Sequence, residues 1–430
     1  MRRIYLDHNA TTGIDPRVRE AMLLELSSIP YNPSSAHHFG KEAKARLQAY
    51  RAQVAAYCKA KPQEILFTSG GTEGMNLLIR GSLYSARPQS VNFGDKILSP
   101  GDCVERDAIS LTASERERSC QSSKDVEKNS HFVVGRSTLQ DHKAHVITTN
   151  TEHSCIYNTL TLLQSQGLQV DFLPSGLWGA VSADQIQKAI RPNTRFIILS
   201  AANNETGVKP DLAAIAEVAK QAQIPLYVDG VALLGKEPLH IPSGVSAMGF
   251  SAHKCHGPKG TGFLYVREGT QLQPLFTGGG QEFHKRAGTE NLAGIAGLAK
   301  AIELLHTELP AAMERMAFLR DKLQTDLQHA LDPVLVNWIG PRVSNTCNLS
   351  FPGIHGEDLL IALDLVGIAV SHGSACTSGA LEPSRVLTQM GIPLEIARTA
   401  IRFSLDRTTT EEEINDVVAA LIQLVSKLRK

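Results

Sequence analysis

The sequence predicts an α/β protein with a large domain built on a doubly wound mixed sheet and a smaller α+β domain. Two observations support this prediction. In the middle of the chain, short apolar runs alternate with amphipathic helical segments, a pattern typical of buried strands connected by helices. In the last third the pattern changes, because amphipathic segments at about 298–309 and 311–331 precede a strand-like run at 348–351.

Length and composition are those of an ordinary globular protein. The chain has 430 residues, with 43 Lys or Arg and 43 Asp or Glu, and a formal net charge of +0. This length predicts two or three domains. Proteins that bind nucleic acids or membrane surfaces normally carry a basic excess, so we expect neither kind of partner.

The N-terminus and the cysteines predict a cytoplasmic, reduced protein. The first residues turn polar by Asp7 without a signal-peptide-like apolar stretch. No segment approaches the roughly 20 apolar residues of a membrane span. The cysteines are scattered and form no C-x-x-C pair, so we expect no disulfide framework and no metal site.

The first strand of the large domain is predicted at 64–68, before the turn Ser69-Gly-Gly-Thr-Glu-Gly74 and a helix from about Met75. A strand, a Gly-rich turn with hydroxyl groups and a helix start form an anion-binding site, because unpaired N–H groups converge there. The turn matches neither the Walker pattern nor G-x-G-x-x-G. It indicates a phosphate-binding turn, with a plain tight turn as the alternative.

Three further strands are predicted to end in polar groups. They are 195–200, before Asn203-Asn-Glu-Thr-Gly207; 226–229, which ends in Asp229; and 247–251, before Ala252-His-Lys254. Pro210 and Asp211 start a helix between the first two. Because a doubly wound sheet binds ligands at the carboxyl ends of its strands, we expect a ligand site there.

Lys254 and Asp229 indicate a pyridine cofactor at this site. A lysine directly after a buried strand is placed for desolvation, which lowers its pKa and favours Schiff-base chemistry. A surface lysine in a Gly-rich loop is the alternative. A carboxylate beside a pyridine nitrogen keeps the ring protonated and able to accept electrons. A phosphate-binding turn, a strand-end Asp and a strand-end Lys, in this order, are the attachment points of pyridoxal 5'-phosphate.

Two more segments stand out. Cys376 is flanked by Gly, Ala and Ser in the run 372–383, which is typical of an exposed, movable thiol, with an inert surface thiol as the alternative. Residues 87–143 are rich in charged residues and serine. Such a composition favours a flexible surface insertion over a small accessory subdomain or partner-binding element.

Together these motifs resemble those of cysteine desulfurases in the class V aminotransferase family, with selenocysteine lyase as a near relative. The matching motifs, in chain order, are Tyr5-Leu-Asp-His-Asn-Ala-Thr-Thr12, Asn32-Pro-Ser-Ser, Phe67-Thr-Ser-Gly-Gly-Thr-Glu73, Thr151-Glu-His153, Asn203-Asn-Glu-Thr-Gly207, Ser251-Ala-His-Lys254, Gly278-Gly-Gly-Gln, Arg286-Ala-Gly-Thr289, Gly373-Ser-Ala-Cys376-Thr-Ser and Ile401-Arg-Phe-Ser. The resemblance implies the fold of fold type I pyridoxal-phosphate transferases. It implies a large domain at 16–310, with the insertion at about 87–143, and a small domain of 1–15 and 311–430 that carries the Cys376 loop.

The resemblance also implies roles for individual residues. Lys254 would form the Schiff base, His153 would stack on the ring and transfer protons, and Cys376 would accept the sulfur. Asp229 would face the pyridine nitrogen, Asn204 would contact cofactor or substrate, and Arg402 would bind the substrate carboxylate through two hydrogen bonds. The phosphate would be held by Gly71, Thr72, Ser251, Ala252 and His253, together with Thr289 from a second subunit of a homodimer.

The implied reaction removes sulfur from L-cysteine to give L-alanine and a persulfide on Cys376, for iron–sulfur cluster assembly or another pathway that uses a sulfur-acceptor or scaffold protein. The alternatives are a selenocysteine lyase that releases selenide and a degenerate protein with a binding or regulatory role. Leu381-Glu-Pro383 after the cysteine resembles the desulfurase form. One departure is Ala232, which stands where the family commonly has a Gln that bonds the phenolic oxygen of the cofactor.

Overall fold

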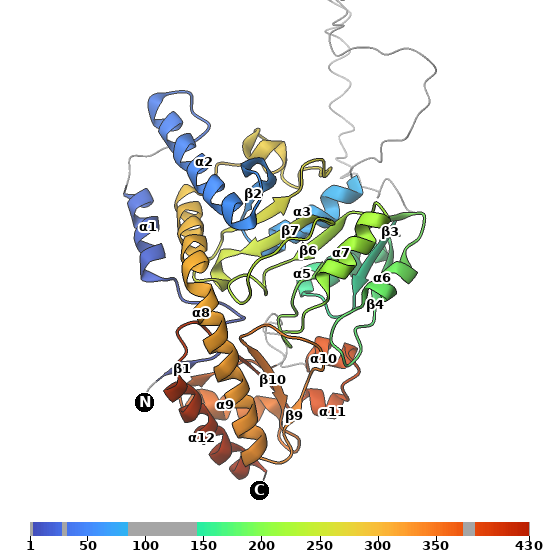
Figure 1. Ribbon diagram of the computed structural model, residues 1–430, viewed down its shortest axis with the longest axis vertical. Helices are drawn as coiled ribbons and strands as arrows, with labels where there is room; N and C mark the ends of the chain where they lie inside the picture. The colour runs from blue at the N-terminus through green and yellow to red at the C-terminus, as the bar shows by residue number, and fades with distance from the viewer. Residues whose placement is uncertain (1–2, 28–31, 85–143, 373–382, 430) are drawn as a thin grey trace, which may run out of the picture. The chain divides into compact units, whose positions relative to one another are not determined.

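The computed structural model describes residues 3–27, 32–84, 144–372 and 383–429 (Figure 1). The predicted insertion at 87–143 and Cys376 therefore lie outside the described residues. Within the described part of the chain, the largest sheet has seven strands in the order β2-β8-β7-β6-β5-β3-β4. Their bounds are β2 (Ile65–Thr68), β8 (Gly262–Val266), β7 (Val245–Ser251), β6 (Leu226–Asp229), β5 (Thr194–Ser200), β3 (His145–Thr149) and β4 (Gln169–Leu173).

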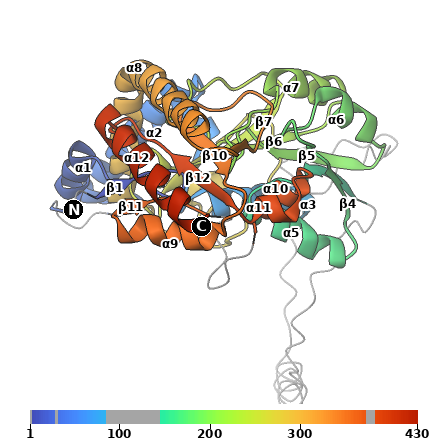
Figure 2. The same ribbon diagram turned by 90° about the horizontal axis from the view of Figure 1, so that it is seen from below.

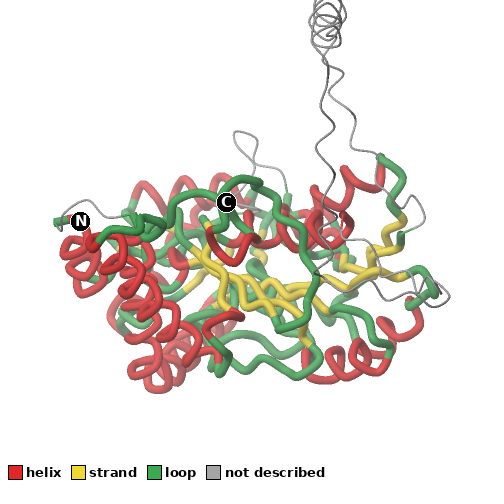
Figure 3. Tube along the Cα trace, turned by 90° about the horizontal axis from the view of Figure 1, so that it is seen from above, coloured by secondary structure: helices red, strands yellow, loops and turns green. Residues whose placement is uncertain are grey.

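This sheet is mixed, because β8 runs antiparallel to both of its neighbours while the other pairs are parallel. Helices cover both of its faces. Figure 2 shows α6 (Ala183–Ala189) and α7 (Leu212–Gln221) on one side, and α3 (Gly71–Tyr84) and α5 (Ser154–Ser165) on the other. In Figure 3 the yellow strands of the sheet run between red helices. The predicted α/β class with a doubly wound mixed sheet is confirmed.

The strands predicted from apolar runs agree with the structure to within a few residues, because those runs are buried on both faces of the sheet. All four residues of β6 are buried, as are the four residues of β2. The predicted helix start at Asp211 is also found, since its carboxylate accepts a hydrogen bond from the backbone N–H of Ala214 at 3.0 Å.

The two amphipathic segments predicted around Pro310 are a single helix, α8 (Leu292–Ala330). The expected break at Pro310 is therefore wrong. A proline removes one backbone donor and disfavours a helix interior, but apolar residues on both sides of it, including Leu305, Leu309, Ala312 and Met316, are buried. Packing of this stripe keeps the helix continuous past the proline.

The C-terminal part of the chain contributes two small sheets and the remaining helices. One sheet is antiparallel, in the order β12-β10-β9, and the other pairs β1 with β11 in parallel. The bounds are β1 (Ile4–Tyr5), β9 (Leu335–Val336), β10 (Thr346–Ser350), β11 (Ile368–Ala369), β12 (Ala400–Ser404), α9 (Gly356–Leu365), α10 (Arg385–Gln389), α11 (Leu394–Ala397) and α12 (Glu411–Leu428). Helices α1 (Pro16–Leu26) and α2 (His38–Cys58) and three short 3-10 helices, η1 (Pro62–Glu64), η3 (Ala252–Lys254) and η4 (Gln281–His284), complete the described chain.

The buried apolar side chains form two main clusters. The first lies on the seven-stranded sheet and includes Ile295 and Leu298 from the start of α8. The second includes Leu319 and Leu323 from the later part of α8, and also Leu6 from the N-terminal segment. One helix thus contributes to both clusters, and the boundaries of the two domains stay a prediction. No helix in the described ranges is both long and apolar enough to cross a membrane.

Candidate functional site

A cavity of about 330 Å³ lies where β5, β6 and β7 end. Ser200 and Asp229, the last residues of β5 and β6, are paired in register, so the two side chains start from neighbouring positions at one edge of the sheet. The cavity is lined by most of the predicted site residues, namely Gly71, Thr72, His153, Asn204, Asp229, Ser251, His253, Lys254 and Arg402. Side chains that are far apart in the sequence therefore meet at the predicted edge.

Two predicted residues that the structure describes, Ala252 and Thr289, do not line this cavity. Ala252 is fully buried and lies in the chain between Ser251 and His253, which do line the cavity. Thr289 is exposed and does not line the cavity of its own chain. Cys376 lies outside the described residues.

One end of the cavity is formed by the N-terminus of α3. Gly71 and Thr72 are its first two residues, and the first N–H groups of a helix have no acceptor within the helix. A Cβ at Gly71 would lie 2.6 Å from Cγ2 of Val231, so Val231 would have to shift to admit a side chain there. Ser251 contributes a hydroxyl and His253 an imidazole to the same cavity. These donors and the helix dipole favour an anionic group at this end.

Lys254 and Asp229 each take part in a hydrogen bond that involves a backbone group. The Lys236 ammonium donates to the carbonyl oxygen of Lys254 at 3.3 Å. The Asp229 carboxylate accepts the backbone N–H of Val231 at 2.9 Å, and only 6% of Asp229 is exposed. The structure thus places a buried carboxylate and a lysine on the wall of one cavity.

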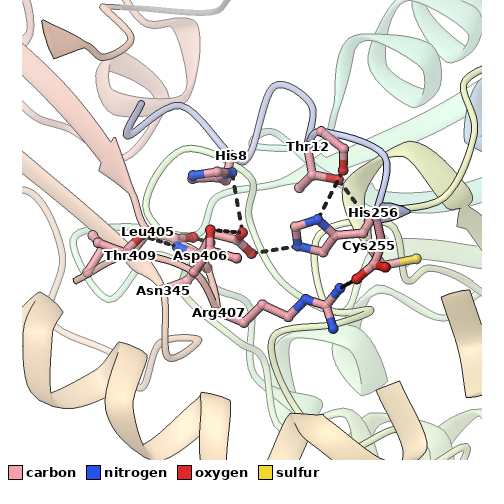
Figure 4. A network of polar contacts seen from close by, with 12 residues as sticks. His8, Thr12, Cys255, His256, Asn345, Leu405, Asp406, Arg407 and Thr409 are labelled. Atoms are coloured by element: carbon pink, nitrogen blue, oxygen red, sulfur yellow. Dashed lines mark hydrogen bonds and ion pairs between the residues drawn. The ribbon is translucent and has the colours of Figure 1, made fainter. Parts of the chain in front are cut away.

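A polar cluster joins Thr12, His256 and Asp406 (Figure 4), and His256 follows Lys254 by two residues. Nε2 of His256 lies 2.8 Å from a carboxylate oxygen of Asp406, and the backbone N–H of His256 donates to the Thr12 hydroxyl at 2.8 Å. Burial alone would raise the pKa of Asp406, but the hydrogen bond from His256 holds that pKa below its ordinary value. The cluster ties the segment after Lys254 to the segment after β12, the strand that carries Arg402.

Arg402 is almost completely buried, with 3% exposed, yet it lines the cavity. Its Nη2 donates to the Asp7 carboxylate at 2.6 Å and to the Ser371 hydroxyl at 3.0 Å. Its Nη1 donates to the carbonyl oxygen of Asn204 at 3.0 Å, and its Nε has no hydrogen-bond partner among the described residues. These contacts orient the guanidinium group at the cavity wall. Among the described residues they leave part of its hydrogen-bond donor capacity unused.

His153 is the N-cap residue of α5. Its Nδ1 accepts the backbone N–H of Cys155 at 3.2 Å and lies 3.0 Å from the Cys155 sulfur. Burial lowers the pKa of His153, and the charges of Lys254 and Arg385 lower it further, against the raising effect of Asp229. The neutral imidazole is therefore favoured.

Several polar residues that line the cavity were not predicted from the sequence: Asn9, Glu152, Cys155, Ser200, Glu205 and Arg385. Glu152 accepts hydrogen bonds from the Thr149 hydroxyl at 2.6 Å and the Ser200 hydroxyl at 2.5 Å. Burial raises its pKa to about 7. Its position shortly after β3, in the same run as His153, is the signal that could have predicted it.

Arg385 follows the undescribed segment that contains Cys376, and it reaches the region before α5. Its guanidinium donates to the carbonyl oxygens of Asn150, at 2.5 Å, and of Glu152. It also lies 3.9 Å from the ring centroid of Tyr157. No sequence motif indicated these contacts, because α10 and α5 meet only in the folded chain.

Ala232 also lines the cavity, so the position where the family commonly has a Gln does face the site. Asn204 lines the same cavity. Among the described residues, no group of three or more His, Cys, Asp or Glu side chains could hold a metal ion.

Comparisons with known proteins agree with this geometry. The family described as "Aminotransferase class-V" matches residues 4–108 and 130–417. A cysteine desulfurase IscS from Dictyoglomus turgidum is 36% identical, with 100% of this chain and 96% of the relative covered. A mitochondrial cysteine desulfurase from Arabidopsis thaliana is also 36% identical, with 100% of this chain and 84% of the relative covered.

Solved structures show the same similarity. A NifS-like protein is 31% identical and has a TM-score of 0.80, with 99% of this chain and 100% of that chain covered. A structure described as SspA in complex with cysteine is 28% identical and has a TM-score of 0.71, with 95% of this chain and 100% of that chain covered. These matches confirm the resemblance inferred from the motifs and the fold that it implied. The chain belongs to the class-V aminotransferase family, within its group of cysteine desulfurases.

Proposed function

We propose that this protein is a pyridoxal-phosphate-dependent cysteine desulfurase. The observation that best supports the proposal is the meeting of Lys254, Asp229, His153 and Arg402 around one cavity. A lysine, a carboxylate and an imidazole are the groups that such a cofactor enzyme needs, and a guanidinium suits an amino-acid carboxylate. All of them are in place, which argues against a degenerate protein.

The cavity residues fit pyridoxal 5'-phosphate. The N-terminus of α3 at Gly71 and Thr72 suits the phosphate group, with Ser251 and His253 beside it. Asp229 is buried at the end of β6, where its carboxylate would hold the protonated ring nitrogen. When bound, the cofactor supplies an electron sink for negative charge that develops at the substrate Cα.

The chain's own residues would perform the remaining tasks. Arg402 would bind the carboxylate of L-cysteine with the donor groups that Asp7 and Ser371 leave available. The Lys254 amine would remove the proton from Cα as a general base. His153 would move protons at the sulfur side of the substrate, where a neutral imidazole can accept one.

Cys376 is the proposed sulfur acceptor. Its thiolate would attack the sulfur of the substrate, so that a sulfur–sulfur bond forms while the Cβ–sulfur bond breaks. The electron pair of the broken Cβ–sulfur bond stays with the carbon part of the substrate, which takes up protons from the site and becomes L-alanine. The sulfur remains as a persulfide on Cys376. A sulfur-acceptor or scaffold protein would then take this sulfur, and iron–sulfur cluster assembly is the pathway that the names of the relatives suggest.

We also propose a homodimer located in the cytoplasm. Thr289 is exposed and does not line the cavity of its own chain. Such a position suits the proposed role of this hydroxyl at the phosphate of a second subunit.

The test uses purified protein loaded with pyridoxal phosphate. We expect a visible absorption band that is lost in Lys254→Ala, and formation of alanine and sulfide from L-cysteine. A protein that shows no band with added cofactor would contradict the proposal. A Cys376→Ala variant should lose activity on L-cysteine while it can still release selenide from selenocysteine. A wild-type protein that acts on selenocysteine but not on L-cysteine would favour a selenocysteine lyase.

A further inference from the structure

Cys155 is a thiol in the wall of the cavity that the proposed reaction does not use, and it contacts His153. Cys155 is the second residue of α5, and His153 caps that helix. The Cys155 sulfur lies 3.0 Å from Nδ1 of His153, and the backbone N–H of the same cysteine donates to the same nitrogen at 3.2 Å. One residue therefore presents two donors to one side of the imidazole.

The surroundings keep the thiol protonated. Burial raises the pKa of Cys155 well above its ordinary value, and the negative charges of Asp229 and Glu152 raise it further. A protonated thiol can donate a hydrogen bond but is a weak nucleophile. Cys155 is thus suited to hold a neighbour, and unsuited to compete with a thiolate for the sulfur of the substrate.

The geometry also determines which nitrogen of His153 carries the proton. A neutral imidazole has one N–H and one acceptor nitrogen. Because Nδ1 accepts the backbone N–H of Cys155, the proton of the neutral ring must lie on Nε2. A thiol donor at the same nitrogen strengthens this preference, since the Nδ1–H tautomer would face two donors.

We propose that Cys155 is a positioning residue that fixes His153 in the Nε2–H tautomer, so that the imidazole exchanges protons with substrate through Nε2 only. The inference rests on the proposed function, because it specifies how His153 acts in that same site. It excludes Cys155 as a sulfur acceptor.

The test reads the histidine ring directly, in holoenzyme labelled with ¹⁵N in its histidines. The signals of His153 are identified by their absence in His153→Gln. In the wild-type protein we expect Nδ1 to have the shift of an acceptor nitrogen and Nε2 that of a protonated nitrogen. An Nδ1–H tautomer in the wild-type protein would overturn the proposal without the need for any variant. Since the readout is a chemical shift, it is independent of whether L-cysteine is the substrate.

Variants then isolate the thiol. Cys155→Ala removes one donor from Nδ1, so the apparent pKa of His153 should rise by about half a unit to one unit, with a matching upward shift of the acid limb of kcat/KM. Cys155→Ser supplies a hydroxyl donor and should restore the wild-type value. The charged groups around the ring, Asp229, Lys254 and Arg385, are unchanged in both variants.

The matched control is Cys347→Ala, which removes a fully buried thiol in β10 that does not line the cavity. It should leave the His153 signals unchanged. An unshifted His153 pKa in Cys155→Ala would overturn the proposal. A persulfide found on Cys155 by mass spectrometry after turnover of L-cysteine would also overturn it, because the residue would then be a nucleophile.

Discussion

Two buried arginines show how similar ion pairs serve different purposes in this protein. Arg51 contacts both carboxylate oxygens of Glu282, at 2.8 and 2.6 Å, and donates to the carbonyl oxygen of Ile65 at 2.6 Å. Its guanidinium also lies 4.7 Å from the ring centroid of Phe67 and 5.0 Å from that of Phe283. Both side chains of this pair are almost completely buried, and neither residue lines the cavity.

Arg402 is as deeply buried but differently engaged. It contacts a single oxygen of Asp7, and its other bonds go to the neutral oxygens of Asn204 and Ser371. Nε lacks a partner in both arginines among the described residues, so that atom does not distinguish them. The difference is that Arg402 lines a cavity with an incomplete set of contacts, and Arg51 has a bidentate partner. Burial of an ion pair therefore does not by itself show whether the pair stabilises the fold or serves the site. The contacts around the pair decide this.

The largest effect is expected from breaking the enclosed pair. Arg51→Met leaves the Glu282 carboxylate buried without its partner, so the free energy of unfolding should fall by about 3–5 kcal/mol. Urea denaturation measures this loss. Arg51→Met combined with Glu282→Leu should recover a large part of it, and a double variant as unstable as the single one would contradict the explanation.

A smaller effect is expected at the pair of Arg402 and Asp7. This effect should be confined to activity. Arg402→Lys replaces a planar guanidinium with a single ammonium, so kcat/KM for L-cysteine should fall by about a hundredfold to a thousandfold. Steady-state assays at several L-cysteine concentrations measure the change. An Arg402→Lys variant with unchanged kcat/KM would show that this guanidinium does not bind the substrate.

The Glu152 carboxyl is buried among hydroxyl groups, whereas the Glu282 carboxylate is paired with an arginine. Burial raises the pKa of Glu152 to about 7, from an ordinary value of 4.5. Between pH 4.5 and 7 the Glu152 carboxyl is therefore protonated in the folded state and ionised in the unfolded state. The free energy of unfolding falls as pH rises through this window. Glu152→Gln removes this dependence, so the variant should gain about 3 kcal/mol on the wild type between pH 4.5 and 7. Urea denaturation at both pH values tests this, and parallel pH curves would refute it.

The smallest effect is expected at Ala232. Ala232→Gln adds an amide at a position that lines the cavity. One hydrogen bond from this amide to pyridoxal phosphate should tighten cofactor binding by about threefold to tenfold. Fluorescence titration of the cofactor-free protein with pyridoxal phosphate measures this affinity. Ala232→Leu serves as the control of similar size without a donor. Equal affinities in the Gln and Leu variants would show that the amide makes no bond there.

Much of the site could be predicted because its main residues follow directly from local patterns. Asp229 and Lys254 come at or just after the ends of apolar runs, and parallel strands bring such ends to one edge of the sheet. The helix start at Asp211 and the Gly-rich turn before α3 are likewise local signals. The roles of Ser251 and His253, by contrast, were implied only by the resemblance to the family.

Contacts between elements distant in the chain could not be predicted in this way. Arg385 reaches the carbonyl oxygens before α5 across more than two hundred residues of chain, and Arg402 meets Asp7 across 395 positions. Their partners depend on how helices and sheets pack, which no short run of residues encodes. Cys155 was missed for another reason, since its role depends on the side chain that it touches.

By itself the sequence determined the α/β class, the strand ends that form the site, and the family, because each depends on local periodicity or on motifs in a given order. Tertiary structure alone decided that α8 continues past Pro310 and that Arg402 and Arg385 line the same cavity. It also decided that the Glu152 carboxyl is buried against the hydroxyl groups of Thr149 and Ser200. The physical reason is that burial and packing set these outcomes, and both are properties of the assembled fold.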